Sequence, residues 1–219
     1  MRAIVMAAGP DDLYEAFGVR KQLLEVAGET LLARMVRQLH ERGVNDVVVT
    51  EPRPGTYPEL DATVVVPPST PSNGKGDHAL NNVDWWSETD RTVQLFGDTF
   101  YTDEAMDTIV GYVPREWRLF CRYGPSEITG CPYGEVFAIS WWPEQGALYQ
   151  EALLTSVALL KAGITRRSGT WEAARILGGA VRRQVRRHVW YPAVMVEIDD
   201  RTEDFDKPGD FERWMELAA

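Results

Sequence analysis

The chain has few cysteines and no long hydrophobic run. Its 219 residues include only two cysteines, Cys121 and Cys131, which allow at most one disulfide and form no CxxC pair. This excludes a disulfide-stapled fold and a zinc ribbon, and it fits a reducing cytoplasm. No apolar segment reaches the ~20 residues that a membrane-spanning helix needs, and the opening MRAIVMAAG runs into PDD without the polar flank of a cleaved signal. We therefore expect a cytoplasmic protein with no membrane partner.

Positive charge is also scarce. Acidic residues number 33 against 23 basic ones, which gives a formal net charge of -10 at pH 7. Such an excess repels phosphate backbones, so it argues against a nucleic-acid partner and requires a local basic pocket for any anionic substrate. The basic segment VRRQVRRH, residues 181–188, either attracts an acidic acceptor or a nucleic acid or forms a solvated face. The three histidines share no metal-ligand spacing.

What the chain does contain is the composition of a folded domain. Apolar residues make up 44% and charged residues 26%, which is enough apolar material for a core. No internal repeat, linker or low-complexity tract divides the sequence. We therefore expect a single domain over residues 1–219.

Hydrophobic periodicity predicts alternating strands and helices. Residues 2–8 form an apolar run typical of a buried strand, and Thr30 precedes a helical pattern that ends at Gly43. Residues 46–50 are the next strand, which completes a βαβ unit with parallel strands. Further strands are expected at 63–66, 92–96, 117–123, 135–140 and 189–198, and further helices at 77–86, 148–162, from 170 onward and at 210–217. This order predicts an α/β fold with three α/β/α layers and a mainly parallel, twisted sheet.

Three turns follow strands of this sheet, where open parallel sheets bind their ligands. The first runs from Gly9 to Lys21 and ends in Arg20-Lys21, so it can surround phosphates with N–H groups and a cation. The second, SNGKG at 72–76, has glycines that let the backbone approach a flat ring or a phosphate. Taken alone, the first turn is as typical of an ordinary surface loop, and the second is more typical of an ordinary turn at a helix N-terminus.

The third turn, FGDTF, carries Asp98 directly after an apolar strand. A carboxylate in this place can bind Mg²⁺, which keeps most of its waters and takes one or two protein oxygens. The alternative is a turn or helix-capping aspartate. A second carboxylate is expected from another strand end, and the C-terminal segment offers several: Asp199 directly follows a predicted strand, while Asp204 and Asp206 flank Phe205.

Several segments, in this order, resemble the nucleotidyltransferase superfamily with a GT-A-like, Rossmann-like nucleotide-binding domain. They are AIVMAAG, KQLLEVAGETLLARMVRQLHERGVNDVVV, NGKGDHALNNV, LFGDT and PYGEV, and together they span most of the chain. Members join a nucleoside monophosphate to a phosphorylated sugar or alcohol. The resemblance implies an NTP and a phosphorylated acceptor as partners, Mg²⁺ as cofactor, and a reaction centre at Lys21, Arg20 and Asp98. It further implies nucleotide contacts at Ala7, Ala8, Gly9, Ser72, Asn73, Gly74, Lys75 and Gly97, and acceptor contacts at Gly134 and Glu135.

The chain departs from the family pattern in two places. The signature loop normally reads GxGxR, whereas this chain has Gly9-Pro10-Asp11-Asp12, so we expect Arg20 or Lys21 to hold the triphosphate instead. The closing motif, usually similar to DIDTPEDLE, can be aligned with either EIDD or DFDKPGDFE. The second magnesium ligand is therefore Asp199 or Asp206, and its place after the apolar alternation of a strand favours Asp199.

These features predict an enzyme that transfers a nucleoside monophosphate from an NTP to a phosphorylated sugar or small alcohol and releases pyrophosphate. Two alternatives stay open. A glycosyltransferase of the same fold would carry a DxD metal element in mid-chain, which Asp98-Thr99-Phe100 does not match. A non-catalytic nucleotide-binding protein would have kept the fold while losing the GxGxR loop.

Overall fold

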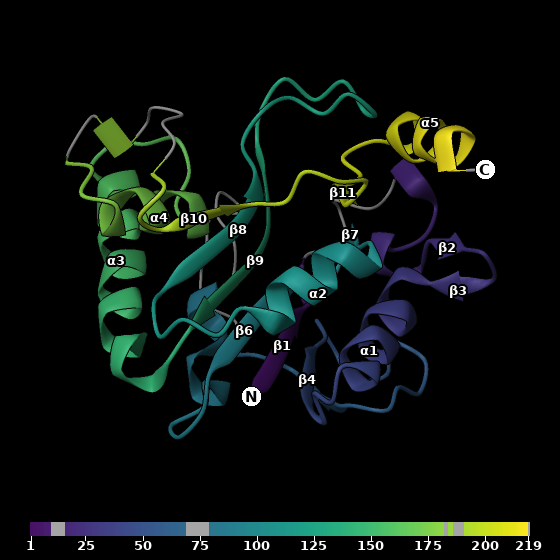
Figure 1. Cartoon of the computed structure of the whole chain (residues 1–219), viewed down its shortest axis with the longest axis horizontal. Coiled ribbons are helices and arrows are strands. Elements are labelled where there is room, and N and C mark those ends of the chain that lie inside the picture. The colour runs from purple at the N-terminus through teal and green to yellow at the C-terminus, as the bar shows by residue number, and fades with distance from the viewer. Residues whose placement is uncertain (10–15, 69–78, 182–183, 186–190, 219) are drawn as a thin grey trace.

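The computed structural model describes residues 1–9, 16–68, 79–181, 184–185 and 191–218 (Figure 1). The predicted base-contacting residues Ser72, Asn73, Gly74 and Lys75 lie outside these ranges, as do the four arginines of the segment 181–188. No described helix has both the length and the apolar character that crossing a membrane requires.

A seven-stranded sheet in the order β10-β8-β9-β6-β1-β4-β5 forms the centre of the molecule. Four neighbouring pairs are parallel, namely β1–β4, β1–β6, β4–β5 and β10–β8, while β9 is antiparallel to both β6 and β8. The predicted, mainly parallel sheet is thus confirmed. The strands are β1 (Arg2–Met6), β4 (Asp46–Thr50), β5 (Thr63–Val65), β6 (Thr92–Phe96), β8 (Arg118–Arg122), β9 (Glu135–Trp141) and β10 (Met195–Glu197).

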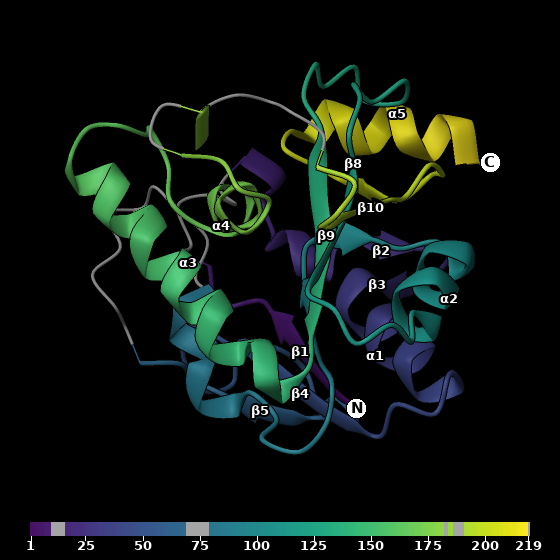
Figure 2. The ribbon, with the colours of Figure 1, turned by 60° about the vertical axis from the view of Figure 1, so that its left-hand side comes forward.

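Helices cover both faces of the sheet (Figures 1 and 2). The helices α1 (Leu31–Glu41) and α2 (Asp103–Gly111) pack on one face, while α3 (Pro143–Lys161), α4 (Thr170–Leu177) and the 3₁₀-helix η3 (Ala79–Trp85) pack on the other. These layers confirm the predicted three-layer α/β/α fold. A further 3₁₀-helix, η2 (Lys21–Leu23), precedes a short hairpin of β2 (Glu25–Val26) and β3 (Glu29–Thr30), and α5 (Pro208–Ala218) ends the described chain.

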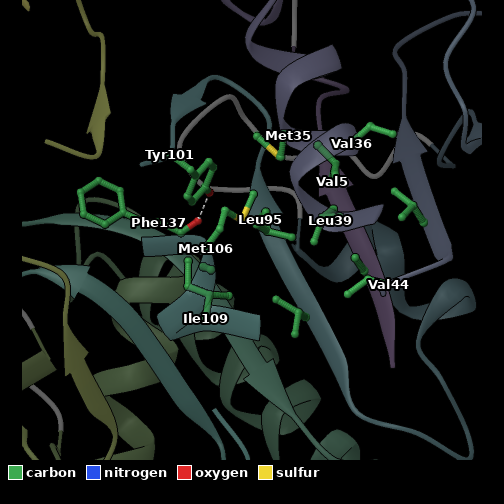
Figure 3. Close-up of a cluster of buried hydrophobic side chains, with 14 of the residues drawn as sticks. Val5, Met35, Val36, Leu39, Val44, Leu95, Tyr101, Met106, Ile109 and Phe137 are labelled. Atoms are coloured by element: carbon green, nitrogen blue, oxygen red, sulfur yellow. Dashed lines mark hydrogen bonds between the residues drawn. The ribbon is translucent and has the colours of Figure 1, made fainter. Parts of the chain in front are cut away.

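The core between the sheet and α1 and α2 is built from apolar side chains of all three elements (Figure 3). Met35 and Leu39 lie one helical turn apart and are both almost fully buried, as the 3.6-residue period requires. The phenol of the buried Tyr101 donates a hydrogen bond to the backbone oxygen of Phe137, which connects the segment just before α2 to β9. The packing therefore fixes α2 against the sheet, close in sequence to the turn that carries Asp98.

Several element boundaries differ from those that the sequence predicts. The first strand ends at Met6, two residues early, and the described part of the segment 77–86 is a 3₁₀-helix. The helix expected from residue 148 begins at Pro143, because proline suits a first helical turn and Gln145 accepts from the Trp142 backbone N–H. Within the described part of the expected strand 189–198, β10 covers Met195–Glu197, and the Tyr191 carbonyl accepts a turn hydrogen bond from the Val194 N–H.

Candidate active site

Lys21 lies between two carboxylates at the carboxyl ends of the strands. Its Nζ is 2.8 Å from Oδ2 of Asp98 and 2.9 Å from Oδ1 of Asp204. The lysine side chain is only 9% exposed, and the two aspartates are 19% and 20% exposed. The three groups therefore place one ammonium group between two carboxyl groups in a largely buried site.

Local backbone structure explains how these groups meet. Lys21 begins the turn of η2, in which the Arg20 carbonyl accepts from the Leu23 N–H at 2.8 Å, and this turn directs its side chain toward the sheet. Asp98 follows Gly97, where a side chain would approach Ala7 Cβ to 2.9 Å and the Met6 carbonyl oxygen to 3.0 Å. Only glycine allows β6 and β1 to end so close together.

Asp204 reaches the site through a small second sheet. The strand β7 (Thr99–Phe100) directly follows Asp98 and pairs antiparallel with β11 (Glu203–Asp204), so that Asp204 lies opposite Thr99. Figure 1 shows β7 and β11 side by side near the start of α5. Since residues opposite each other in an antiparallel pair lie within about 5.5 Å at Cα, this pairing brings Asp204 next to Asp98.

Burial and charge act against each other in this cluster. Burial lowers the pKa of Lys21, but the nearby carboxylates of Asp204 and Asp98 raise it by more, so the lysine stays charged. Burial raises the pKa of Asp204, Lys21 opposes that shift, and the carboxylates of Asp98 and Asp206 add to it. A further cation would therefore bind favourably beside Asp204.

The two aspartates suit a magnesium ion better than a metal ion whose ligands are all protein side chains. Asp98 and Asp204 both present an oxygen toward one point, as their shared contact with Lys21 shows. Within the described ranges, no group of three or more His, Cys, Asp or Glu side chains has the arrangement of a metal site. Mg²⁺ suits such a pair, because it prefers oxygen and commonly takes one or two carboxylates, water and substrate phosphates.

Of the predicted nucleotide-contacting residues that the structure describes, Ala7 lies next to Gly97, the residue before Asp98. The Ala7 N–H donates to the Thr50 hydroxyl at 3.0 Å, and the Tyr57 phenol donates to the Ala7 carbonyl, which fixes the backbone at the end of β1. The Arg20 guanidinium donates two hydrogen bonds, of 3.2 and 3.0 Å, to the Gly9 carbonyl. Arg20 therefore joins the start of the loop to its end, and residues 10–15 between them are outside the described part.

A cavity of about 910 Å³ adjoins the Lys21 centre. Its walls come from the β8–β9 loop, the segment leading into α4, and the segment from β11 to α5. Burial, together with the carboxylates of Asp204 and Asp206, raises the pKa of Glu135 in this cavity to about 8. The charged and aromatic lining residues include Tyr133, Glu135, Arg166, Arg167, Trp171, Asp204, Asp206 and Lys207.

The structure brings some of the predicted site residues together and separates others. Lys21 and Asp98 are in contact, and Glu135 and Asp206 line the adjoining cavity. Neither Asp199 nor Asp206 contacts Lys21; Asp199 is exposed just beyond β10, and Asp204 takes the place at Lys21. Asp204 was among the sequence candidates, but nothing in its local pattern distinguishes it from Asp206. The pairing of β11 with β7 is what places it at Lys21.

The backbone around position 134 requires a glycine. A Cβ at this position would lie 2.4 Å from the Arg122 carbonyl oxygen and 2.6 Å from that of Tyr123. The glycine therefore lets the start of β9 approach the end of β8, and it forms a wall of the cavity through that backbone approach. A direct contact of Gly134 with the acceptor stays a prediction.

Comparisons with known proteins show the family and the fold of the chain. The model of the MobA-like NTP transferase domain matches residues 3–163, which is more than half of the chain. No curated protein sequence matches the chain significantly. The resemblance to the nucleotidyltransferases that the sequence motifs indicate is thus confirmed.

Solved structures of similar fold cover nearly the whole chain. A proposed glucose-1-phosphate thymidylyltransferase from Bacillus anthracis has a TM-score of 0.62 and 12% identity, covering 100% of this chain and 95% of the other. A UDP-glucose pyrophosphorylase from Acinetobacter baumanii has a TM-score of 0.60 and 11% identity, covering 98% and 91%. A CTP:phosphocholine cytidylyltransferase from Streptococcus pneumoniae has a TM-score of 0.54 and 12% identity, covering 100% and 99%. At these identities the likeness concerns the fold.

Proposed function

Because the chain belongs to the MobA-like NTP transferase family, we propose that it transfers a nucleoside monophosphate from an NTP to a phosphorylated sugar or small alcohol, with release of pyrophosphate. The observation that carries this proposal is the position of Lys21, in contact with both Asp98 and Asp204 at the carboxyl edge of the sheet. The cavity of about 910 Å³ beside Asp204 is large enough for a small phosphorylated acceptor.

The two substrates would approach this centre from opposite sides. The NTP would lie along the end of β1 and the turn at Gly97, where Ala7, Gly9 and Arg20 are fixed by hydrogen bonds. The acceptor would occupy the cavity, with its phosphate toward Lys21. Arg166, Arg167 and Lys207 line that cavity together with several acidic side chains, and these three would contact the anionic group of the acceptor.

The reaction needs no covalent enzyme intermediate. An oxygen of the acceptor phosphate attacks the α-phosphorus of the NTP in line, a new P–O bond forms, and the bond to the pyrophosphate leaving group breaks. Orientation of the two substrates and neutralisation of charge therefore supply the catalysis. The Lys21 ammonium, held charged by its two aspartates, would offset the charge that develops at the α-phosphoryl group.

Magnesium is part of this proposal. Asp98 and Asp204 would hold the ion, which when bound neutralises phosphate charge and aligns the phosphoryl oxygens. Lys21 and the ion would compete for the oxygens of the two aspartates. A cytoplasmic location also remains a proposal, supported by the two free cysteines, Cys121 and Cys131.

The test is pyrophosphate release from a panel of the four common NTPs, each mixed with phosphorylated sugars and phosphorylated small alcohols in the presence of Mg²⁺. We expect release with one NTP and one class of acceptor, and none from an Asp98→Asn variant that keeps the wild-type melting temperature. Failure of every combination, with folded protein, would refute the proposal. Consumption of a sugar nucleotide would favour the glycosyltransferase alternative, and NTP binding without turnover would favour a non-catalytic protein.

A further inference from the structure

A buried ion pair lies directly beside Asp204 in the chain. The Arg122 guanidinium donates two hydrogen bonds to the Glu203 carboxylate, at 2.9 Å to Oε1 and 3.0 Å to Oε2. The Ser126 hydroxyl donates a third, at 2.5 Å, to Oε2. The Glu203 side chain is 1% exposed and that of Arg122 is 10% exposed, so this cluster of Arg122, Ser126 and Glu203 is almost completely withdrawn from water.

The cluster helps to fix β11, which is itself a very short strand. It has two residues, Glu203 and Asp204, and among the described strands it pairs with the equally short β7. Arg122, in contrast, ends a five-residue strand inside the main sheet. The ion pair therefore connects the strand that carries Asp204 to a rigid element that lies about 80 residues earlier in the sequence.

The same cluster shapes a wall of the cavity. The Ser126 hydroxyl accepts from the Thr129 N–H at 3.0 Å, and the Ser126 N–H donates to the Cys131 carbonyl at 2.8 Å. Thr129 and Cys131 both line the cavity next to Asp204. The Glu203 carboxylate thus contacts the β8–β9 loop, and Glu203 is the chain neighbour of the site aspartate.

We propose that Arg122, Glu203 and Ser126 are positioning residues, which hold Asp204 against Lys21 and set the distance between that aspartate and the acceptor-side wall. Their effect on turnover rests on the function proposed above, whereas their effect on the position of Asp204 does not. A buried ion pair commonly adds little net stability over an apolar replacement, but its fixed, two-pronged geometry orients the groups attached to it. That property fits a residue adjacent to a site carboxylate.

The first experiment measures the position of Asp204 without substrate or metal. Lys21 is shielded by its two aspartates, whereas Lys161 at the end of α3 is exposed and serves as an internal reference. An amine-reactive reagent followed by mass spectrometry gives the labelling rate of each. We expect Glu203→Gln to raise the Lys21 rate relative to Lys161 about tenfold, since hydrogen bonds to a charged group are lost. Asp204→Asn gives the reference for complete loss of the contact.

A matched control removes a different ion pair of the same chemistry. Glu29 accepts from Arg37 at 2.8 to 3.3 Å on β3, away from the site, so Glu29→Gln should leave the Lys21 labelling rate unchanged. Ser126→Ala, which keeps the ion pair and removes only the hydroxyl, should raise the rate by a smaller factor. It also provides the test if Glu203→Gln does not fold.

The second experiment separates positioning from general destabilisation. In the proposed transferase reaction, Glu203→Gln should have a kcat about tenfold lower and an acceptor KM about tenfold higher than the wild type. Its KM for NTP should change less than twofold. A variant that is merely less stable would lose active protein and leave both KM values unchanged. Wild-type Lys21 labelling in folded Glu203→Gln or Ser126→Ala would overturn the proposal. If the wild-type protein shows no turnover at all, only the proposed function fails, since the labelling result still decides the positioning role.

Discussion

Replacing Asp204 by asparagine tests the assignment that differs most from what the sequence favours. The change removes one of the two negative charges at Lys21 and keeps the shape of the side chain. The contact it weakens is 2.9 Å long and lies between groups that are 9% and 20% exposed. We expect the protein to fold and its turnover to fall at least a hundredfold.

The structure gives the expected magnitudes. At 2.9 Å and an effective dielectric constant near 20, the Coulomb attraction is about 6 kcal/mol. Asp98 still neutralises Lys21, and the repulsion that Asp98 and Asp206 exert on Asp204 disappears, so the net loss of stability should be well below this Coulomb energy. Loss of a group that stabilises charge in the transition state typically costs about 3 kcal/mol, which is the hundredfold loss in kcat.

The assay is pyrophosphate release as a function of Mg²⁺ concentration, with a melting curve for each variant. Asp204→Asn should need more Mg²⁺ for half of its maximal rate. Asp199→Ala is the matched control, because Asp199 is exposed and lies away from Lys21, and its metal dependence should equal that of the wild type. The reasoning is refuted if Asp199→Ala loses the metal dependence while folded Asp204→Asn keeps the wild-type rate.

Three further predictions concern the same region. Lys21→Ala should lower kcat more than it changes the KM for NTP, since the lysine acts on developing charge, and a variant with unchanged kcat but a lower melting temperature would make the lysine purely structural. Gly97→Ala should cost about 2 kcal/mol of folding free energy in chemical denaturation, because its Cβ would lie 2.9 Å from a neighbouring side chain, whereas Gly111→Ala meets nothing within 4 Å and should be tolerated. Burial raises the pKa of Glu135 from 4.5 to about 8, so the folded state holds a proton that the unfolded chain releases; the resulting stabilisation is complete below about pH 4.5 and is lost as the pH rises through about 8. The stability of Glu135→Gln relative to the wild type should therefore increase by about 1–2 kcal/mol as the pH rises from 5 to 8.5. An equal stability difference at the two pH values would contradict the shifted pKa.

The sequence determined those features that depend on neighbours along the chain. The apolar run around Ile4 predicts a strand buried on both faces, and Ile4 is fully buried in β1. Thr30 precedes the pattern of α1, and its hydroxyl accepts from the Ala33 N–H at 3.2 Å, as a helix cap does. Asp98 could be placed at a strand end for the same reason, since the apolar strand and the turn that follows it are adjacent in the sequence.

Only the tertiary structure decided which C-terminal acid meets Lys21. Asp199, Asp204 and Asp206 are the same residue type and each neighbours an apolar residue in the sequence, so the local pattern does not rank them. The choice is made by the pairing of Asp204 with Thr99, across about 100 residues, and by the contact of Glu203 with Arg122. Such contacts depend on strand register and on the packing of distant elements, and a shift of one residue in β11 would turn Asp204 to the opposite face. The sequence therefore determined the fold and one half of the charged centre, while long-range pairing determined the other half.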